Sequence, residues 1–246
     1  WRVADALVDY LSSINPGVHS FNPIVGECND SFLNDILGRH VTREHVLAAI
    51  ESATFPNIEE GNVGAGAGTT AFGWKAGIGT SSRVCDSLGD QYTVGSLTLA
   101  NAGDPQDFRI DGVNIGRHFL PPGTTSEGGG SIVVVIGTDA PITARQASRL
   151  ARRSLFGLAR VGGMSPHAIG DCTIVFSNSR ERPHVDDTHL TPLFRGVVEA
   201  TEEAMINSVL RSETVVGRDG NIRRGIPIDK LREVLANNTH DVQVQD

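Results

Sequence analysis

The sequence predicts an α/β protein in which helices cover apolar strands. Strand-like apolar runs alternate with amphipathic helical stretches along the chain. The clearest strand, residues 131–136, is almost continuously apolar, which is typical of a strand buried on both faces. With 246 residues, 39% of them hydrophobic, the chain is long enough to bury a sizeable core. Helices on both faces of the sheets are the natural cover for such strands.

Four elements are expected, in order, in the first half of the chain. Residues 2–14 carry apolar side chains four positions apart and predict an amphipathic helix. Thr42 is a good N-cap for a second helix. Residues 92–99 predict a strand, and Asp111-Gly112 within residues 108–115 favours the type I′ turn of a hairpin.

The second half begins with a linker at residues 121–130, which holds two prolines, four glycines and small polar residues. We interpret it as an interruption of one fold, because the residues after it lack the marks of a separate domain. A capping box at 143–146 then opens a helix that carries Leu150, Leu155 and Leu158. The last expected elements are a short buried strand at 173–176, a helix from Thr191 to about Leu210, and a short helix capped by Asp229.

Composition and charge narrow the functional classes. Twenty-one basic residues against twenty-nine acidic ones give a net charge of −8, which disfavours binding to nucleic acid. The sequence has no run of about 18 apolar residues, so we expect no membrane-spanning helix. The first residue is Trp1 instead of Met, so we expect a trimmed N-terminus and leave the compartment open, with a slight preference for the cytoplasm.

The cysteines and histidines predict no metal site, and we expect no cofactor. Cys28, Cys85 and Cys172 are widely spaced and form no CxxC pair, so they indicate neither a zinc site nor a disulfide framework. We expect three buried or half-buried thiols. The eight histidines are scattered without ligand spacing, and we interpret them as structural.

Residues 61–80 hold seven glycines and invite comparison with phosphate-binding loops. Lys75 is preceded by tryptophan and followed by alanine, so the P-loop pattern GxxxxGK[ST] is not met. The glycines at 64, 66 and 68 alternate, unlike the GxGxxG of a dinucleotide site. Alternating glycines instead suit close backbone packing, or a backbone pressed against a substrate.

A second glycine run ends at Gly130, and the next residue, Ser131, opens the apolar strand. If the bond between them were cut, Ser131 would carry a free α-amine beside its own hydroxyl. An α-amine has a reference pKa of about 7.7–8.0, so it can act as a general base and activate the hydroxyl without a histidine. The residues alone leave open, and even favour, the simpler reading of an ordinary loop end.

Four segments, taken in their order along the chain, favour cleavage before Ser131 over an ordinary loop end. They are VGECNDSFLNDILGRHV at 25–41, EEGNVGAGAGTTAFGWKAGIGTSSRV at 59–84, YTVGSLTLANAG at 92–103 and GGGSIVVVIGTDAPI at 128–142. Together they resemble the L-aminopeptidase/D-esterase (DmpA-like) family, which includes the β-peptidyl aminopeptidases. The similarity extends over roughly residues 25–210.

The resemblance implies a precursor that cleaves itself at Gly130–Ser131. Residues 1–130 and 131–246 would then form one domain with the αββα sandwich of an Ntn-hydrolase-like fold. The family releases N-terminal residues from peptides, amides or esters that have a free amine. Its two chains stay together and assemble into oligomers, with a tetramer favoured.

The resemblance also assigns site residues. Ser131 matches the nucleophile, and Asn101 the asparagine that stabilises the oxyanion. Glu27 matches the acid that binds the substrate amine, with Asn29 beside it in GECND. Lys75 matches a lysine near the active site of some relatives. Without the resemblance, Asn101 would be read as a strand-end residue, Glu27 equally well as a surface ion-pair partner, and Lys75 as packing its stem on glycines.

One motif departs from the family pattern, which has a relay group, a spacer and an acid after the long helix. Asp171 matches the acid, but the relay position holds Ile169, which makes no hydrogen bond. Ser165 or His167 is a possible substitute for the relay. Two alternatives follow: a relative specialised for acyl transfer or amide oligomers, and a catalytically impaired protein that only binds amines.

Overall fold

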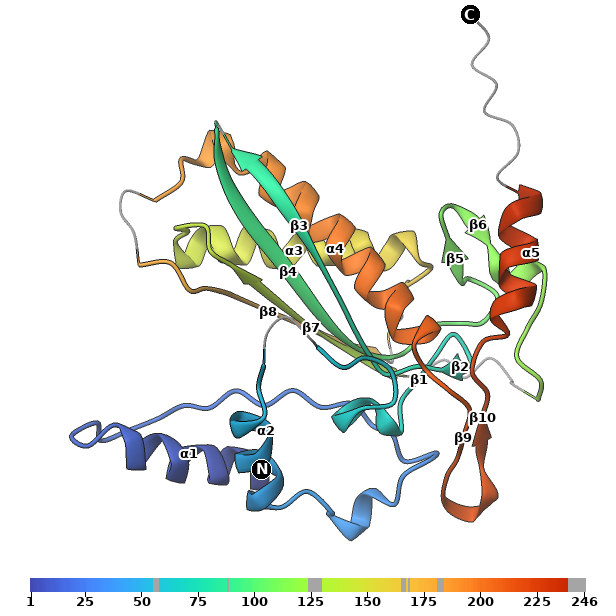
Figure 1. Ribbon diagram of the computed structural model, residues 1–246, viewed down its shortest axis with the longest axis horizontal. Helices are drawn as coiled ribbons and strands as arrows, with labels where there is room; N and C mark the ends of the chain where they lie inside the picture. The colour runs from blue at the N-terminus through green and yellow to red at the C-terminus, as the bar shows by residue number, and fades with distance from the viewer. Residues whose placement is uncertain are drawn as a thin grey trace, which may run out of the picture.

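The computed structural model describes residues 1–54, 58–87, 89–123, 130–164, 167, 169–180 and 184–238. Its centre is a four-stranded sheet in the order β3-β4-β7-β8 (Figure 1). The first three strands are antiparallel, whereas β8 runs parallel to β7. The bounds of these strands are β3 Ile78–Ser87, β4 Asp90–Asn101, β7 Gly130–Thr138 and β8 Ile169–Ser177.

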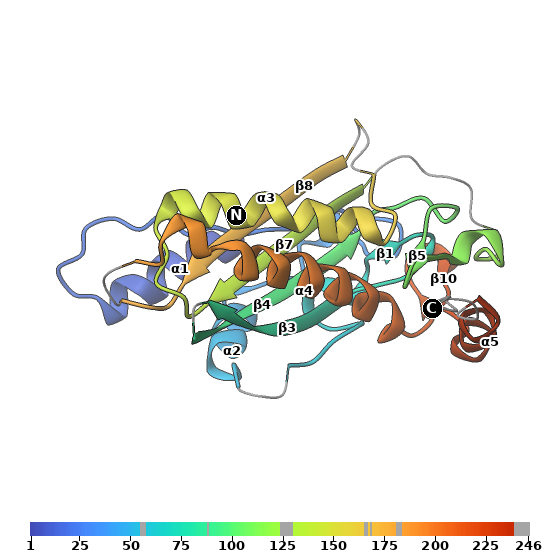
Figure 2. The same ribbon diagram turned by 90° about the horizontal axis from the view of Figure 1, so that it is seen from above.

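Three two-stranded hairpins lie toward one end of this sheet (Figures 1 and 2). They are β1 Thr70–Ala71 with β2 Trp74–Lys75, β5 Arg109–Ile110 with β6 Val113–Asn114, and β9 Val215–Val216 with β10 Ile222–Arg223. Short 3₁₀ turns lie at Ile36–Gly38, Gly64–Ala67, Ile115–Arg117, Asp187–His189 and Arg218–Gly220.

The helices lie in two groups, one on each side of the sheet. Seen from above, α3 (Ala144–Arg160) and α4 (Thr191–Leu210) lie across one face (Figure 2). The helices α1 (Arg2–Ile14) and α2 (Arg43–Glu51) lie on the other side (Figure 1). The last helix, α5 (Ile228–Asn238), is at the same end of the molecule as β5 and β6. None of the helices in the described ranges is long and apolar enough to span a bilayer.

The main core lies between the sheet and helices α3 and α4. Because side chains alternate along a strand, Ile132, Val134 and Ile136 of β7 all point to this side. They pack with residues of the two helices, among them Leu150 and Leu193, which are fully buried. This alternation explains why every second side chain of the apolar strand lies in the core between the sheet and the two helices.

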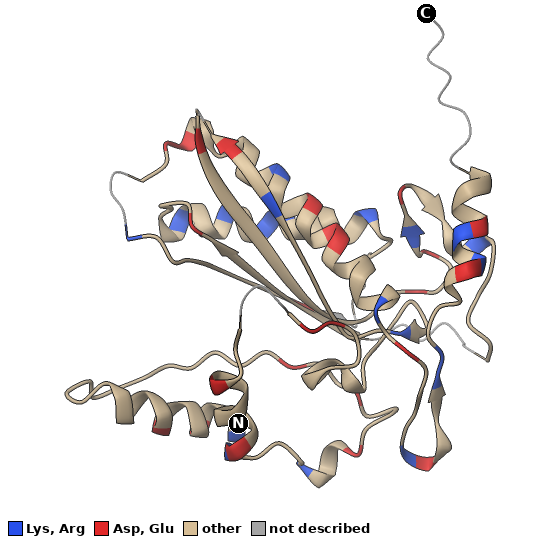
Figure 3. Ribbon diagram, viewed as in Figure 1, with Lys and Arg blue, Asp and Glu red and all other residues tan. Residues whose placement is uncertain are grey.

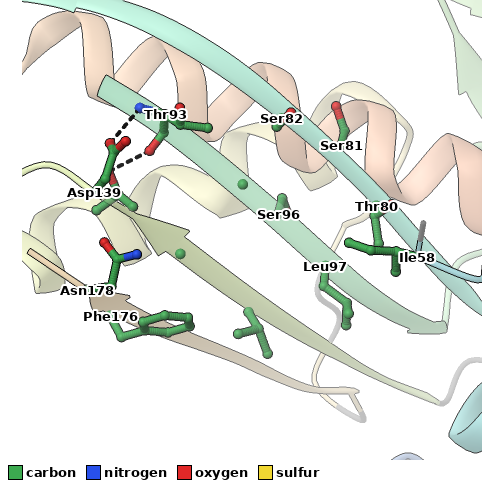
Figure 4. Close-up of a pocket in the computed structure, with 14 residues that line it drawn as sticks. Ile58, Thr80, Ser81, Ser82, Thr93, Ser96, Leu97, Asp139, Phe176 and Asn178 are labelled. Carbon is green, nitrogen blue, oxygen red and sulfur yellow. Dashed lines mark hydrogen bonds between the residues drawn. The ribbon is translucent and has the colours of Figure 1, made fainter. Parts of the chain in front are cut away.

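The opposite face of the sheet is only partly covered within the described residues. Near the start of β7, Cys28, Leu99 and Val133 form a small second cluster. Toward the other end, Val84 is 68% exposed and Phe176 is 52% exposed. A pocket of about 820 Å³ lies on this half of the face, and Figure 4 shows the side chains that line it.

Most elements predicted from the sequence are confirmed. The helix at 2–14, the Thr42 N-cap, the strand at 92–99 inside β4 and the helix from Thr191 to Leu210 are all present. The hairpin of β5 and β6 turns at Asp111 (φ 49°) and Gly112 (φ 76°), as a type I′ turn requires. The predicted α/β class is therefore confirmed.

Other expectations were wrong. Residues 131–136 are not fully buried on both faces, because the half of the sheet beyond Val133 lacks a covering layer within the described residues. Cys172 is exposed on that same face instead of buried. Asp229 lies inside the first turn of α5 instead of capping it. Strand β3 was not predicted, because its serines and arginine obscure the alternation.

Candidate active site

The candidate nucleophile lies where three strands meet. Strand β7 begins at Gly130, and its second residue, Ser131, pairs with Asn101 at the end of β4. On its other side Ser131 pairs with Gly170 near the start of β8. Among the described residues, none has an atom within 4 Å of a Cβ placed at Gly170, so they leave the space beside Ser131 open on that side. The sheet thus places Asn101 and Ser131 next to each other.

Gly130 has a backbone that only glycine adopts without strain. Its φ is 153°, and a Cβ at this position would lie 2.3 Å from the carbonyl oxygen of Asn101. The same Cβ would lie 2.8 Å from the Cβ of Ala102. The residue before Ser131 therefore has to be glycine for β7 to pair with β4 in this way.

The carboxamide of Asn101 is held in one orientation by two backbone groups. Its Oδ1 accepts a hydrogen bond from the Thr70 N–H at 3.1 Å. Its Nδ2 donates to the Asn29 carbonyl oxygen at 2.8 Å. Because each amide nitrogen has two hydrogens, one N–H of Asn101 is available to a further acceptor. This geometry suits a donor for a developing oxyanion.

The segment 27–30 lies beside the start of β7. The buried Cys28 donates a hydrogen bond from Sγ to the Ser131 carbonyl oxygen at 3.3 Å. Glu27 is exposed, and its carboxylate is close enough to Cys28 to help raise the pKa of that thiol, although burial is the larger cause. The Asn29 side chain accepts from the Ser31 N–H at 3.0 Å and so stabilises the turn. Glu27 and Asn29 therefore both lie near Ser131.

Lys75 is fully buried beneath the glycine-rich stretch. Its Nζ donates to the carbonyl oxygens of Gly66 at 2.8 Å and Ala76 at 2.5 Å. Burial lowers the pKa of Lys75 to about 8, and the carboxylate of Asp30 opposes this shift. Lys75 also pairs with Thr70, the residue whose N–H holds Asn101. The backbone of Lys75 thus pairs with the residue that orients Asn101, while its amine binds the neighbouring Gly66 and Ala76 carbonyl oxygens.

Asp171 lies next to the site but on another face of the sheet. It pairs with Ile132, one position beyond the pair of Ser131 and Gly170. Strand alternation therefore places its side chain on the helix-covered side, where its Oδ1 is buried. The side chain of Ile169 and all of Ser165 lie outside the described residues, and His167 is exposed. The structure therefore pairs Ser131 with Asn101 and brings the segment that carries Glu27 and Asn29 against both, whereas the side chain of Asp171 lies on the other face of the sheet.

No metal site accompanies this arrangement in the part of the chain that the structure describes. Within those residues, no group of three or more His, Cys, Asp or Glu side chains is placed to hold an ion. The pocket over the uncovered half of the sheet is lined by none of the predicted site residues. Among the polar groups that line that pocket, Asp139 Oδ1 accepts from the Thr93 N–H at 2.7 Å and Thr138 Oγ1 donates to the Thr93 carbonyl oxygen at 2.7 Å, so these groups bind one another (Figure 4). The start of β7 is therefore the candidate site.

An α/β protein whose central strand carries a serine as its second residue, directly after a glycine and beside an oriented asparagine carboxamide, has the layout expected of a hydrolase with an N-terminal nucleophile. The comparisons with known proteins agree, and the chain belongs to peptidase family S58. The model of that family, described as "Peptidase family S58", matches residues 1–223.

Two curated relatives are β-peptidyl aminopeptidases. The enzyme BapA of Sphingosinicella xenopeptidilytica is 38% identical over 238 residues, which cover 87% of this chain and 59% of that protein. The BapA of Sphingosinicella microcystinivorans is 36% identical over an alignment of 260 residues. This alignment covers 95% of this chain and 65% of that protein. The chain thus spans less than two thirds of the length of either relative.

A solved structure extends the likeness to the fold. The L-aminopeptidase D-Ala-esterase/amidase of Ochrobactrum anthropi, described as a variant of the Ntn-hydrolase fold, superposes with a TM-score of 0.88. It is 31% identical, and the match covers 96% of this chain and 70% of that one. The resemblance to the L-aminopeptidase/D-esterase family and to the Ntn-hydrolase fold is therefore confirmed.

Sequence reasoning did not single out two contacts that hold the site together. The Thr70 N–H acts through the backbone, which no sequence motif reveals. Cys28 lies between Glu27 and Asn29 in GECND, so its position in that motif was the available signal.

Proposed function

We propose that the chain is a self-processing aminopeptidase whose nucleophile is Ser131. The single observation that supports this most is the start of β7, where a sterically required glycine precedes a serine that pairs with the oriented Asn101. In self-processing, Ser131 Oγ attacks the Gly130 carbonyl carbon, and the acyl group moves from nitrogen to oxygen. Water then hydrolyses the ester, leaving a Gly130 carboxylate and a free Ser131 α-amine.

The same groups would act on a substrate. Ser131 Oγ attacks the scissile carbonyl while the α-amine accepts its proton, and Nδ2 of Asn101 donates to the oxyanion. The α-amine then returns the proton to the leaving amine, and water hydrolyses the acyl-enzyme. Lys75 would contribute positive potential and support Asn101 through Thr70. Asp171 would act from the other face of the sheet, on the α-amine instead of the hydroxyl.

Denaturing electrophoresis with N-terminal sequencing tests self-processing. The wild type should give two chains, of which one begins Ser-Ile-Val-Val-Val. Ser131→Ala should remain one chain and lose turnover by several orders of magnitude, because the attacking oxygen is gone. Ser82→Ala, at an exposed serine of β3, is the matched control and should be cleaved normally. A cleaved Ser131→Ala protein would refute the mechanism, and an uncut wild type would favour the amine-binding alternative.

Glu27 is proposed to bind the free amine of the substrate, with Asn29 beside it. Hydrogen bonds to charged groups contribute about 1.5–3 kcal/mol, so Glu27→Gln should lower kcat/KM for a free-amine substrate by about 10- to 100-fold. Self-cleavage should be nearly unchanged, because the Gly130–Ser131 bond presents no free amine. If the wild type hydrolysed N-acetylated and free substrates equally well, this role would be wrong.

A narrower substrate class is favoured by one observation. The α-carbon of Gly130, next to the attacked carbonyl, has no room for a substituent. If a substrate's acyl carbon takes the same place, a CH₂ beside the carbonyl is preferred, as in glycyl and β-amino acyl units. The curated relatives are named β-peptidyl aminopeptidases, which agrees. A β-alanyl amide should then be cleaved faster than an L-alanyl amide, and the reverse order would exclude this preference.

The assembly of the protein is also a proposal. We expect residues 1–130 and 131–246 to remain associated after cleavage and to form a tetramer of such pairs. Light scattering on the purified protein would measure the mass of the assembly, and a mass of one pair would exclude the tetramer.

A further inference from the structure

We propose that the segment 27–30 is a clamp that holds the freed chain end of Ser131 and the carboxamide of Asn101 in register. The proposal rests on the self-processing described above. It assigns Cys28 as a positioning residue, because its Sγ–H binds the nucleophile's own carbonyl oxygen at 3.3 Å.

Cleavage removes a restraint from the nucleophile. Before cleavage, Ser131 is held on its N-terminal side by the peptide bond to Gly130, whose conformation the neighbouring strand fixes. After cleavage, Ser131 is the end of a chain, and chain ends fray unless they are held down. Its remaining backbone restraints in the described structure are the strand pairing with Asn101 and Gly170 and the hydrogen bond from Cys28.

Cys28 is built into the sheet face and is not a surface thiol. It is 9% exposed, and it packs with Leu99 and Val133 in the second apolar cluster. The preceding Gly26 approaches so closely that a Cβ there would lie 2.9 Å from Cγ1 of Val133. Burial raises the pKa of the Cys28 thiol, which keeps the donor proton in place. The segment therefore has a fixed position on β7.

The same segment also fixes the oxyanion donor. One residue after Cys28, the Asn29 carbonyl oxygen accepts from Nδ2 of Asn101 at 2.8 Å. The Asn29 side chain closes the turn that aims this carbonyl, by accepting from the Ser31 N–H. Two successive residues of one segment thus hold the two groups whose relative position determines the rate. A shift of about 1 Å at such groups costs up to about 100-fold.

If the segment 27–30 acts as this clamp, a substitution at Cys28 should affect substrate turnover by Ser131 but not self-cleavage. Cys28→Ala should lower kcat for a small free-amine amide by about three- to tenfold, with KM changed less than about twofold, since thiol hydrogen bonds are weak. Self-cleavage should keep its wild-type rate, because Ser131 is still tethered on both sides when that bond breaks. Cys28→Ser, which keeps a donor, should restore at least half of the lost kcat.

The experiment measures four variants for self-cleavage rate, kcat, KM and melting temperature. Cys85→Ala, at a buried cysteine away from the site, is the matched control and should leave kcat unchanged. Cys28→Val, which fills the volume without a donor, replaces Cys28→Ala if the latter does not fold. Equal kcat in Cys28→Ala and the wild type would overturn the clamp. So would equal losses in Cys28→Ser and Cys28→Ala, or equal slowing of self-cleavage and turnover. If the wild-type protein were never cleaved, the proposed function would be refuted, and the clamp, which rests on it, would be refuted as well.

Discussion

The two faces of the central sheet differ in what they do. On the side of α3 and α4, strand β7 contributes Ile132, Val134 and Ile136 to a fully packed core. On the other side the same strand carries Ser131, followed by Val133 and the partly exposed Val135. Alternate residues of one strand are thus assigned to stability and to chemistry. Ser131, the proposed nucleophile, therefore lies on a rigid strand without interrupting the core that makes the strand rigid.

Charged residues are also distributed unequally between the helix-covered side of the sheet and the opposite face. In Figure 3, acidic and basic residues gather on α3, α4 and α5 and are sparse on the strands of the central sheet. On the outer side of the helices they form ion pairs such as Arg160 with Glu202 and Arg145 with Asp187. On the uncovered half of the opposite face, Asp139 is the single charged residue among the described residues that line the pocket.

The largest effect that would sharpen the comparison is expected at Asn101. Removing one oxyanion donor typically costs about 10²–10³ in kcat, so Asn101→Ala should lose this much turnover. Asn207→Ala is the matched control, because Asn207 donates to the Thr80 carbonyl oxygen from the helix side. It should destabilise the protein by about 1 kcal/mol and leave kcat unchanged. Equal effects of both variants on kcat would break the division between the faces.

A smaller effect is expected from two neighbouring valines. Val134 is 1% exposed on the helix side, whereas Val135 is only partly buried on the other side. Val134→Ala should lower the free energy of unfolding by about 2–3 kcal/mol, from lost burial plus a cavity. Val135→Ala should cost less than about 1 kcal/mol. Urea unfolding of both variants measures the difference, and equal losses would mean that the outer face is covered in solution.

The last effect is a pH dependence of stability that depends on Lys75. Its folded pKa of about 8 lies below the unfolded value of 10.5, so between these values the unfolded state binds more protons. Stability should therefore rise with pH from about 8 to 10.5 in the wild type relative to Lys75→Met, by up to about 1.4 kcal/mol per pH unit. Urea unfolding at several pH values measures this slope. Lys230→Met, at the exposed lysine of α5, is the control, and a flat difference would contradict the burial of the amine.

The sequence predicted elements that have strong local signals. The capping box at Thr143 and Gln146, and the Asp111-Gly112 turn, depend on a few neighbouring residues, and both formed as expected. Strand β3 was not predicted, because polar side chains interrupt the alternation of apolar residues along it. These side chains bind residues that are distant in sequence, as Arg83 does with Glu203.

For the site, the resemblance located Ser131 and Asn101, and the structure places them side by side. What no local pattern supplied was the face on which each residue lies. Asp171 follows Gly170 directly, but one position along a strand reverses the direction of the side chain. The contact from Cys28 joins residues 103 positions apart, which spacing alone cannot indicate.

The pairing of β4 with β7 has a consequence for the reaction order of folding. All the hydrogen bonds between these strands join residues before Gly130 to residues after it. In the uncut chain they form within one polypeptide, so folding is unimolecular. If the Gly130–Ser131 bond is cut as proposed, the same ladder joins two polypeptides, and recovery from denaturation becomes bimolecular and dependent on concentration. The mature protein would then owe its lifetime to slow unfolding, and a denatured sample would not regain the state that its precursor reached alone.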